Sequence, residues 1–472
     1  MIHQSLIYGD KFGNAEMRAV WSEQSMVQGW LDFEAALAWA QGEIGIIPRR
    51  VAARIVRRCN VRDVTPKAIA KWHARTGHVI VSLVKSFREA APDVGEMFHF
   101  GPTTQDVLDT GLTLQIRDSL ALIVPRLVRL ERIVRAQARR YRSTVMAGRS
   151  EGQIGSPITF GYKLAVVDSE IADHVERLAQ ASRRLMWLTL SGATGVQASF
   201  CQIAGVVKTQ RMVKLVARRL DLPVPPVCMH HRTDRFTELG LVLANLLSTL
   251  GELGMEIRDL ARSEVAEVAE PWGADRHSSS TMPQKQNPEV SEWLEGLAQL
   301  GRGYAMSLLD IRQQHERDTS RVPSELHALP NLLLHAIAAI DSAAFVLEGI
   351  RVDTKRMREN MLRNGGLIMS EAVMLLLAKR SGRKVWAHQH CHDISMRIAE
   401  EGGDLVDAMI ADPDVRRYLD RSEIREACRP EYYIGTAAQQ VDRTAAECAR
   451  RVAGALRTLR VLFRNKRGHI RK

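Results

Sequence analysis

Hydrophobic residues recur every three or four positions over long stretches of the chain, with polar residues between them. This spacing gathers the apolar side chains on one face of a helix and therefore predicts amphipathic helices. The longest stretches fill the middle of the chain and are bounded by Gly, Pro, Ser or Thr: 105–142, 159–188, 236–265, 289–313 and 328–350. In its first half, the stretch 236–265 is apolar over most of its circumference, so neighbouring helices must cover it on nearly every side. The pattern predicts a bundle of long helices.

Shorter helical stretches precede and follow this bundle. Pro48, Pro66 and Pro92 interrupt the stretch before it, and the motifs "RNGG", "EEGG" and "ADPD" interrupt the stretch after it. Strand patterns are scarce. We therefore predict an all-α protein with three helical domains, which are an N-terminal domain over 1–100, a central long-helix domain over 101–355 and a C-terminal domain over 356–472.

The composition is that of a large globular protein with an excess of positive charge. The chain has 472 residues, of which 45% are hydrophobic, enough for a sizeable core. Its net charge is +12, and residues 457–472 hold seven Lys and Arg and no acid. This basic end has no pattern of interleaved aromatic residues and no recognition motif, so we do not expect it to bind nucleic acid. A less specific interpretation of the positive charge is that it attracts an anionic substrate.

The cysteines and the N-terminus indicate a cytoplasmic protein. Six cysteines are widely spaced, without a Cys-x-x-Cys motif, which argues against a disulfide framework and against a zinc site. The first residues, "MIHQSLIYGDKFGNAEM", lack the charged-then-apolar order of a signal peptide. Glu238, Asn245 and Glu252 break the most apolar stretch, so no membrane span is expected.

The stretch "HSSSTMPQKQNP", from His277 to Pro288, interrupts a chain that is otherwise rich in helix-forming residues. Ser, Pro and Asn favour loops because their side chains or fixed φ compete with helical hydrogen bonds. A loop of hydroxyls beside a lysine is a candidate active-site loop. Residues 278–288 resemble the signature of the fumarase/aspartase superfamily, Gly-Ser-Ser-x-Met-Pro-x-Lys-x-Asn-Pro, which forms a mobile catalytic loop. Ten of the eleven positions fit, and Ser278 stands where Gly is usual.

Two further segments support the resemblance, in the same order along the chain. The segment "HFGPTTQDVLDT" (99–110) is similar to the superfamily's first substrate-binding segment, and "GRSEGQIGSPITFGYKLA" (148–165) is similar to the second. Segments near both ends look most like the 3-carboxy-cis,cis-muconate cycloisomerase branch, whereas "HERDTSRVPSE" (315–325) leans toward adenylosuccinate lyase. The resemblance covers essentially the whole chain.

The resemblance implies an assembly and a reaction. Members of the superfamily pack their long helices across subunits into the multi-helix core of a homotetramer. Each active site would then draw 99–110, 148–157 and 272–292 from three different chains. In the reaction, removal of a proton from the carbon beside a carboxylate gives a dianionic aci-carboxylate, and a leaving group then departs to give a fumarate-type product. Stabilisation of the dianion by fixed donors and a cation usually contributes most to catalysis of this kind.

Carried over position by position, the resemblance assigns roles within the signature loop. Ser279 would be the general base, acting as an alkoxide, while Lys285 and Asn287 would hold the substrate carboxylate. A serine hydroxyl is a poor base unless backbone N–H groups and positive charge stabilise its anion. The resemblance implies no cofactor and no metal ion.

The first segment offers two hydroxyls and an amide, at Thr103, Thr104 and Gln105, that can bind carboxylate oxygens. Thr103 also fits a helix N-cap, and both interpretations can hold because a helix N-terminus favours anions. His78 and His99 match histidines near the superfamily's site, although a single histidine is as often structural.

The second segment departs from the superfamily's pattern. Where many members have Arg-Thr-His, this chain has Arg149-Ser150-Glu151, and Glu292 is retained where a glutamate bonds that histidine. Two carboxyl groups would then face each other, so one of them should hold a proton at neutral pH. The pair could supply a general acid, or it could be structural if the leaving group needs no acid. Arg149, Ser150 and Gln153 are expected to bind substrate.

Positions that hold a nucleotide phosphate in adenylosuccinate lyases differ in this chain. Lys11 and Phe12 replace an Arg-Tyr pair, and Leu326 replaces the second arginine. Asp234 and Arg235 of the family's Arg-Asp-Arg are kept, and we expect Arg235 to contribute to substrate binding. The substrate is therefore expected to be a smaller polycarboxylate.

The favoured interpretation is a homotetrameric, cofactor-free lyase that eliminates a β-substituent from a succinate-like polycarboxylate. A muconate-type cycloisomerase would use the same carbanion chemistry to open or close a lactone. A third hypothesis is a catalytically silent relative, made possible by the lost histidine. A protein kept only as a scaffold gains nothing from Ser279, Lys285 and Asn287, which argues against the third hypothesis.

Overall fold

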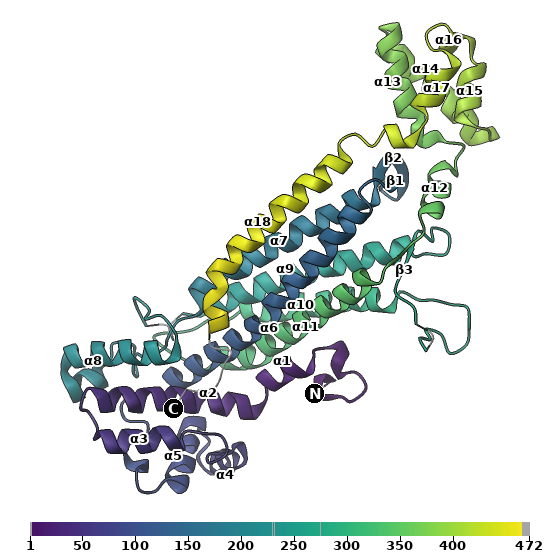
Figure 1. Cartoon of the computed structure of the whole chain (residues 1–472). Coiled ribbons are helices and arrows are strands. Elements are labelled where there is room, and N and C mark those ends of the chain that lie inside the picture. Colours follow the sequence, from purple (N-terminus) through teal and green to yellow (C-terminus); the bar gives the residue numbers. More distant parts are fainter. Residues whose placement is uncertain (1, 229, 231, 274, 465–472) are drawn as a thin grey trace.

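An elongated bundle of long helices forms the body of the molecule, and shorter helices gather at its two ends (Figure 1). The computed structural model describes residues 2–228, 230, 232–273 and 275–464, so residues 465–472 of the basic end lie outside the described residues. The described elements are α-helices and short 3-10 helices, apart from four short strands. The prediction of an all-α protein is confirmed.

In the described part of the chain, five long helices make up the body of the bundle. They are α6 (Thr104–Arg140), α7 (Phe160–Leu185), α9 (Asp234–Leu260), α10 (Glu289–Leu309) and α11 (Arg321–Glu348). The hydrophobic spacing predicted all five, although α11 begins several residues earlier than expected. Leu239, Leu243 and Leu250 of α9 are fully buried, whereas Leu241 is 44% exposed, so neighbouring helices cover most of its apolar first half but not all of it.

Helices α9 and α11 are also long and apolar enough to cross a membrane, judged by length and composition alone. A third candidate arises only if the residues 354–362 and 367–381, which are bent by 77°, are counted as one span. Inside the bundle, 56% of the apolar window of α9 and 78% of that of α11 are buried. Packing inside the bundle therefore covers most of the apolar window of α11 and more than half of that of α9.

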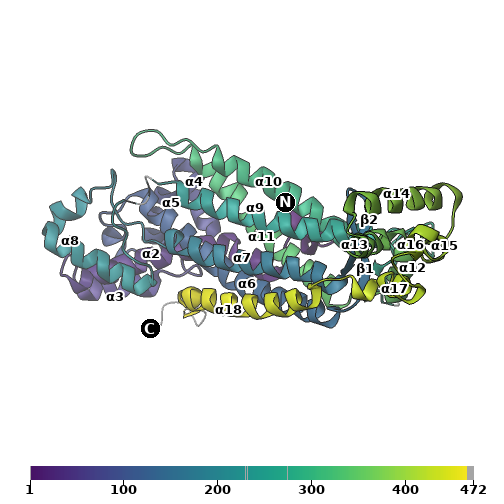
Figure 2. The same cartoon turned by 90° about the horizontal axis from the view of Figure 1, so that it is seen from above.

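The N-terminal helices cap the end of the bundle where α6 and α9 begin (Figures 1 and 2). They are α1 (Ala15–Val20), α2 (Glu23–Glu43), α3 (Arg49–Arg58), α4 (Pro66–Thr76) and α5 (Val79–Ala90), and α8 (Ala198–Leu220) packs on α2. Pro66 is the first residue of α4, where the missing N–H of proline has no helical partner to lose.

A small cluster of helices with its own core lies at the opposite end (Figure 2). It contains α12 (Thr354–Leu362), α13 (Ser370–Ser381), α14 (Lys384–Glu401), α15 (Leu405–Ala411), α16 (Pro413–Arg416) and α17 (Arg421–Ala427). The last helix, α18 (Ala437–Arg464), runs back along the bundle and packs on α7 and α6. The division into domains over 1–100, 101–355 and 356–472 stays a prediction.

The strands that the structure describes form two small antiparallel sheets. Strand β1 (Val145–Ser150) pairs with β2 (Gln153–Thr159), and β3 (Val268–Ala269) pairs with β4 (Arg351–Val352). The β1–β2 hairpin, which the sequence pattern did not predict, follows the C-terminus of α6 and contacts α12 (Figure 1).

Candidate active site

The signature loop connects β3 to α10, and Ser279 lies within it. The Oγ of Ser279 accepts hydrogen bonds from the backbone N–H groups of Met282 and Thr281, at 2.9 and 3.3 Å. N–H groups that are fixed in place stabilise negative charge on the oxygen they face. This local turn therefore favours an anionic Ser279.

A second set of hydrogen bonds closes the neck of the loop. The Oγ of Ser278 donates to the carbonyl of Lys285 at 2.6 Å and accepts from the backbone N–H of Asn287 at 2.9 Å. The Nδ2 of Asn287 donates to the carbonyl of Ser278 at 2.9 Å. These three hydrogen bonds, the neck clasp, join Ser278 to Lys285 and Asn287 and so close the segment that carries Ser279.

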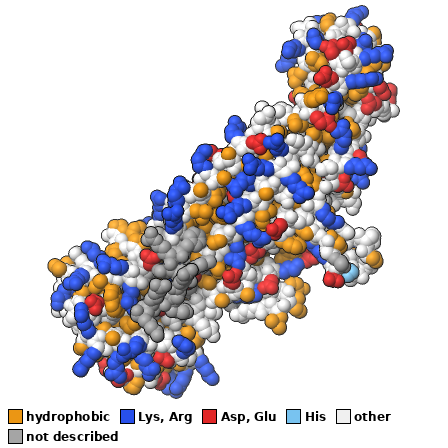
Figure 3. Space-filling model, in the orientation of Figure 1, with side chains coloured by type: hydrophobic (Ala, Val, Ile, Leu, Met, Phe, Trp, Pro, Cys, Tyr) orange, Lys and Arg blue, Asp and Glu red, His pale blue; other side chains and the backbone are white. Residues whose placement is uncertain are grey.

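Three of the predicted residues, Lys285, Asn287 and Glu292, line one cleft of about 920 Å³. The Nζ of Lys285 forms no hydrogen bond or ion pair with any residue that the structure describes. Lys and Arg side chains are spread over the molecular face in Figure 3. The other cationic residues that line the cleft are Arg258, Arg262, Arg351 and Lys355. The cleft is therefore suited to an anionic ligand.

Both ends of the signature loop are anchored on the bundle. The Nη2 of Arg351 in β4 donates to Oε1 of Gln286 at 2.7 Å, and its Nε donates to the carbonyl of Glu270 at 2.9 Å. The buried carboxylate of Glu270 accepts from the backbone N–H and the Oγ of Ser291, at 2.7 and 2.8 Å. Ser291 lies in the first turn of α10, so Glu270 ties the start of the loop to its end.

Thr103, Thr104 and His78 meet at the N-terminus of α6. Thr103 is the N-cap, in a capping box with Asp106, which confirms the predicted helix cap. The Oγ1 of Thr104 lies 3.3 Å from Nε2 of His78. The Nδ1 of His78 accepts the backbone N–H of Val81, so a neutral ring carries its proton on Nε2, the atom that faces Thr104. A donor thus lies beside a helix N-terminus, which favours anions.

His99, in the same segment, is held by a buried carboxylate. Its Nδ1 lies 2.6 Å from Oε1 of Glu34 in α2. Burial lowers the pKa of His99, but the charge and the hydrogen bond of Glu34 outweigh burial and leave the pKa above its ordinary value. His99 also has a φ of 58°, a conformation that costs energy and that is concentrated at functional sites. The contact with Glu34 therefore favours the protonated form of His99 near the N-terminus of α6.

Gln105 and Arg235 point into the protein interior. The Nε2 of Gln105 donates to Oδ1 of Asp109, one turn further along α6. The buried guanidinium of Arg235 lies 3.8 Å from the same carboxylate, which also pairs with Arg321 at 2.7 Å. Within one protomer both residues belong to a buried charge network, and their contact with substrate stays a prediction.

Glu151 lies in the turn of the β1–β2 hairpin. Glu151 and Gly152 have φ values of 53° and 78°, and they stand between the paired residues Ser150 and Gln153. A two-residue turn with positive φ at both positions matches the twist of the adjoining strands. Ser150, Glu151 and Gln153 are all exposed, so they are available to a ligand or to another protomer.

Arg149, at the base of the same hairpin, faces the bundle. Its Nη1 and Nη2 donate to the two carboxylate oxygens of the buried Glu267, at 3.1 and 2.5 Å. Glu267 also accepts from Nδ2 of Asn360 at 2.9 Å. The pair fixes the hairpin against β3, and a role of Arg149 in substrate binding stays a prediction.

The predicted residues fall into two groups at opposite ends of α6. The N-terminus of α6 carries the threonines and histidines, while the hairpin follows its C-terminus. A helix of 37 residues is ~55 Å long. In the part of the chain that the structure describes, Glu151 and Glu292 share no hydrogen bond or ion pair. One protomer therefore does not bring all the predicted residues into one site.

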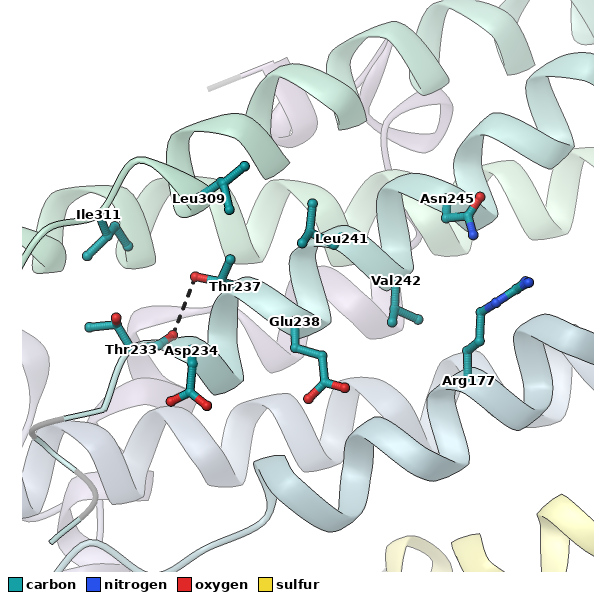
Figure 4. A pocket seen from close by; sticks show the side chains of 10 residues that line it. All are labelled: Arg177, Thr233, Asp234, Thr237, Glu238, Leu241, Val242, Asn245, Leu309 and Ile311. Atoms are coloured by element: carbon teal, nitrogen blue, oxygen red, sulfur yellow. Dashed lines mark hydrogen bonds between the residues drawn. The ribbon is translucent and has the colours of Figure 1, made fainter.

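A second cavity, of about 480 Å³, lies between α7, α9 and α10 (Figure 4). Its two carboxylates are already paired, Asp234 with Arg232 at 2.6 Å and Glu238 with Arg184 at 2.9 Å. The described residues that line it include none of the predicted catalytic side chains. The cleft beside the signature loop, which three of the predicted residues line, is therefore the better candidate for the active site.

Among the described residues, one group has the composition of a metal site. The ligand atoms of His390, Asp412 and Asp414 lie within 4.8 Å of one another in the C-terminal cluster. The Oδ1 of Asp412 lies 2.9 Å from Nε2 of His390 and accepts the backbone N–H groups of Asp414 and Val415. These contacts explain the group as the N-cap of α16.

Three residues of the candidate site were not selected from the sequence. Arg317, between α10 and α11, donates through Nη1 to the Oγ1 of Thr103 at 2.7 Å. It lies in the stretch 315–325, whose resemblance to adenylosuccinate lyase assigns no role to Arg317. Glu34 lies in the N-terminal segment that resembles the cycloisomerase branch, but the resemblance points to no single residue there. Arg351 stands in a segment without a recognisable motif, so only the structure reveals the contacts of both residues.

The sequence and the fold are similar to those of known enzymes. The sequence matches the family described as "Lyase" over residues 11–300 and the family "Adenylosuccinate lyase C-terminus" over residues 366–444. It is 36% identical to the 3-carboxy-cis,cis-muconate cycloisomerase of Pseudomonas aeruginosa, over 92% of this chain and 95% of that protein. It is 33% identical to the N-acetyl-S-(2-succino)cysteine lyase of Dickeya dadantii, over 93% of this chain and 95% of that protein.

A solved structure, the 3-carboxy-cis,cis-muconate lactonizing enzyme of Pseudomonas putida, is similar with a TM-score of 0.87 at 32% identity. The similarity covers 95% of this chain and 100% of that one. The chain therefore belongs to the lyase family of the fumarase/aspartase superfamily, in the branch of adenylosuccinate lyase and 3-carboxy-cis,cis-muconate cycloisomerase.

Proposed function

We propose that the protein eliminates a β-substituent from a succinate-like polycarboxylate, with Ser279 as the base. The observation that carries the proposal is the pair of backbone N–H groups that lie 2.9 and 3.3 Å from the Oγ of Ser279. An alkoxide at this position would take the proton from the carbon beside a substrate carboxylate and become a hydroxyl. The electron pair of the C–H bond would form the double bond, and the leaving group would depart with its own bonding pair.

The cleft beside the loop supports this chemistry. Lys285 supplies a cation, and Asn287 supplies an amide whose second N–H is not used by the neck clasp. Both can face the carboxylate that becomes dianionic when the proton is removed. Fixed donors and a cation that face developing charge usually lower the barrier more than any other single effect.

We propose that the complete site forms in a homotetramer. The ~55 Å length of α6 separates the hairpin from Thr103 and Thr104 in one protomer. Protomers that pack antiparallel would bring the N-terminus of one α6 to the hairpin of another. Each site would then combine 99–110, 148–157 and 272–292 from three chains, with Glu151 facing Glu292.

A muconate-type cycloisomerase is the second candidate, and Glu151 is the observation that favours it. The hairpin tip carries a glutamate where many members of the superfamily have a histidine. In the elimination direction, the leaving group of a lactone is a carboxylate, which departs with little help from an acid. A site without the histidine therefore suits a lactone or another good leaving group.

We also propose a cytoplasmic location. All six cysteines lie in the described part of the chain, and none of them forms a disulfide. Proteins of reducing compartments typically lack disulfides.

The test is a substrate panel with the purified protein. Substituted succinates with sulfur, nitrogen or carboxylate leaving groups would be compared with 3-carboxymuconate and its lactone, while ultraviolet absorbance follows fumarate or the diene. Release of fumarate would support the lyase, and conversion of the lactone pair would support the cycloisomerase. A folded protein that converts nothing in the panel would contradict both and favour a silent relative.

A further inference from the structure

Ser278 stands where the superfamily signature has glycine, and its side chain makes two of the three hydrogen bonds of the neck clasp. We infer that Ser278 is a positioning residue that holds Lys285 and Asn287 in place relative to Ser279. The inference rests on the proposed function, in which Ser279 is the base. A glycine at this position could form neither side-chain bond.

The partners of the Ser278 hydroxyl indicate positioning rather than blockage of the site. It bonds to the backbone carbonyl of Lys285 and to the backbone N–H of Asn287. The reactive Nζ of Lys285 is left without a partner among the described residues, and the Oγ of Ser279 still faces its two N–H groups. The clasp thus fixes the backbone and leaves the reactive side chains available.

The clasp acts on the segment that carries the chemistry. Inside the neck, residues 279–286 have one backbone turn bond, from the N–H of Lys285 to the carbonyl of Met282 at 3.1 Å. Outside it, Arg351 and Glu270 anchor the ends of the loop on the bundle. Without the Ser278 hydroxyl, the segment would keep its anchors but sample more conformations. A displacement of about 1 Å in a catalytic group can lower a rate by ~100-fold.

The clasp also has an electrostatic consequence. A cation near an acid favours the charged form of the acid, so an ammonium of Lys285 held beside Ser279 in the working site would lower the pH at which the alkoxide forms. If the neck loosened, Lys285 would spend less time in that position, and the base would need a higher pH. The rising limb of the rate profile should therefore move to higher pH, which a general loss of stability would not cause.

The kinetic test compares three substitutions. Ser278→Gly and Ser278→Ala should lower kcat by ~10-fold or more, move the rising limb of the kcat profile to higher pH and change KM less than kcat. Ser278→Thr keeps the hydroxyl and should restore both kcat and the profile. Ser307→Ala is the matched control, because its hydroxyl donates to the carbonyl of Tyr304 at 2.8 Å near the other end of α10. It should behave as the wild type.

Amide hydrogen exchange tests the clasp without any substrate. The backbone N–H of Asn287 should exchange faster in the Gly and Ala variants than in the wild type, the Thr variant and the Ser307→Ala control. An active wild type with unchanged exchange, kcat and pH profile in the Gly and Ala variants would overturn this inference alone. Faster exchange in a protein that converts nothing in the panel would instead overturn the proposed function, and the positioning role with it.

Discussion

Three consecutive serines in the signature loop have the same side chain and different surroundings. Ser278 bonds across the neck, Ser279 accepts two backbone N–H groups, and Ser280 is exposed. Composition alone cannot separate them, because each offers the same hydroxyl. The backbone groups that bond to each hydroxyl do distinguish them. Two backbone N–H groups donate to the Oγ of Ser279, so negative charge is favoured on this oxygen.

Ser279→Ala should lower kcat by at least ~100-fold, the usual scale of a lost general base, with the fold intact. Steady-state kinetics would measure the loss, while circular dichroism and solution mass check the fold. Ser280→Ala is the natural comparison and should retain far more activity. If Ser279→Ala kept activity within a few-fold of the wild type, Ser280 would become the candidate base.

The His99–Glu34 contact predicts a stability difference that depends on pH. The pKa of His99 is raised in the folded protein, because the charge and hydrogen bond of Glu34 outweigh burial. The stabilisation is therefore fully present below the unfolded pKa of about 6.5 and is lost as pH rises through the folded pKa. The Tm difference between wild type and Glu34→Gln should be largest at acidic pH and shrink on the alkaline side. A difference that does not vary with pH would argue against the ion pair.

At the scale of elements, the β1–β2 hairpin shows where a local pattern fails. Gly148, Gly152 and Gly155 interrupt any alternation of apolar and polar residues, so the pattern does not predict strands in this segment. Ala147 is nevertheless buried in the core of the C-terminal cluster, and Arg149 is fixed by Glu267. Contacts with distant parts of the chain create this element, and a sequence window contains no such information.

The start of α11 was missed for a related reason. The polar stretch 315–325 placed the expected start near 328, but α11 begins at Arg321. Arg321 is buried and pairs with Asp109 of α6 and with Glu325, at 2.7 and 2.8 Å. A sequence pattern places a charged residue at the surface when the partner that allows its burial lies far away in the sequence. The long amphipathic helices were predictable because their signal is local.

Substitution of Glu151, in the hairpin turn, tests most directly which kind of leaving group the site accepts. If Glu151 shares a proton with Glu292 of another protomer, Glu151→Gln should slow poor leaving groups much more than good ones and should move the acid limb of the kcat profile. If Glu151 only fills the space of the histidine, Glu151→Gln should leave both kcat and its pH profile nearly unchanged.

Glu151→His on the same substrate is the companion variant. Restored or increased turnover would show that the position still serves proton transfer. Loss of turnover in the histidine variant, with retention in the glutamine variant, would mean that the pocket suits a leaving group that departs unaided.

At the scale of the whole molecule, the sequence motifs predict parts of a site that a single chain does not bring together. Lys285, Asn287 and Glu292 share one cleft of the protomer, whereas Thr103 and Thr104 lie beyond the length of α6. A motif does not reveal which copy of the chain supplies it. In the proposed tetramer, that information would depend on how the apolar faces of the long helices pack between protomers.

The proposed assembly predicts a solution mass of four chains of 52.9 kDa and sites shared among them. A mixture of Ser279→Ala and Thr104→Ala protomers, reassembled after dissociation, should regain activity that neither variant has alone, because some mixed sites contain no altered segment. Light scattering and activity of the mixture are the measurements. A mass of one chain at micromolar concentration, or no recovery in a mixed tetramer, would contradict shared sites.

The chain leaves the bundle at α12 and returns to it with α18, so the small helical cluster is inserted between two elements of the main body. Among the described residues, its core is separate from that of the long helices and extends into the hairpin, where Ala147 is part of it and Val145 and Ile154 pack against it. In evolutionary terms, such an insertion can change sequence without disturbing the register of the bundle. It also adjoins the hairpin that carries Glu151 (Figure 1). Selection for a new substrate therefore has a separate piece of protein on which to act, next to the position where this chain differs from the superfamily's Arg-Thr-His pattern.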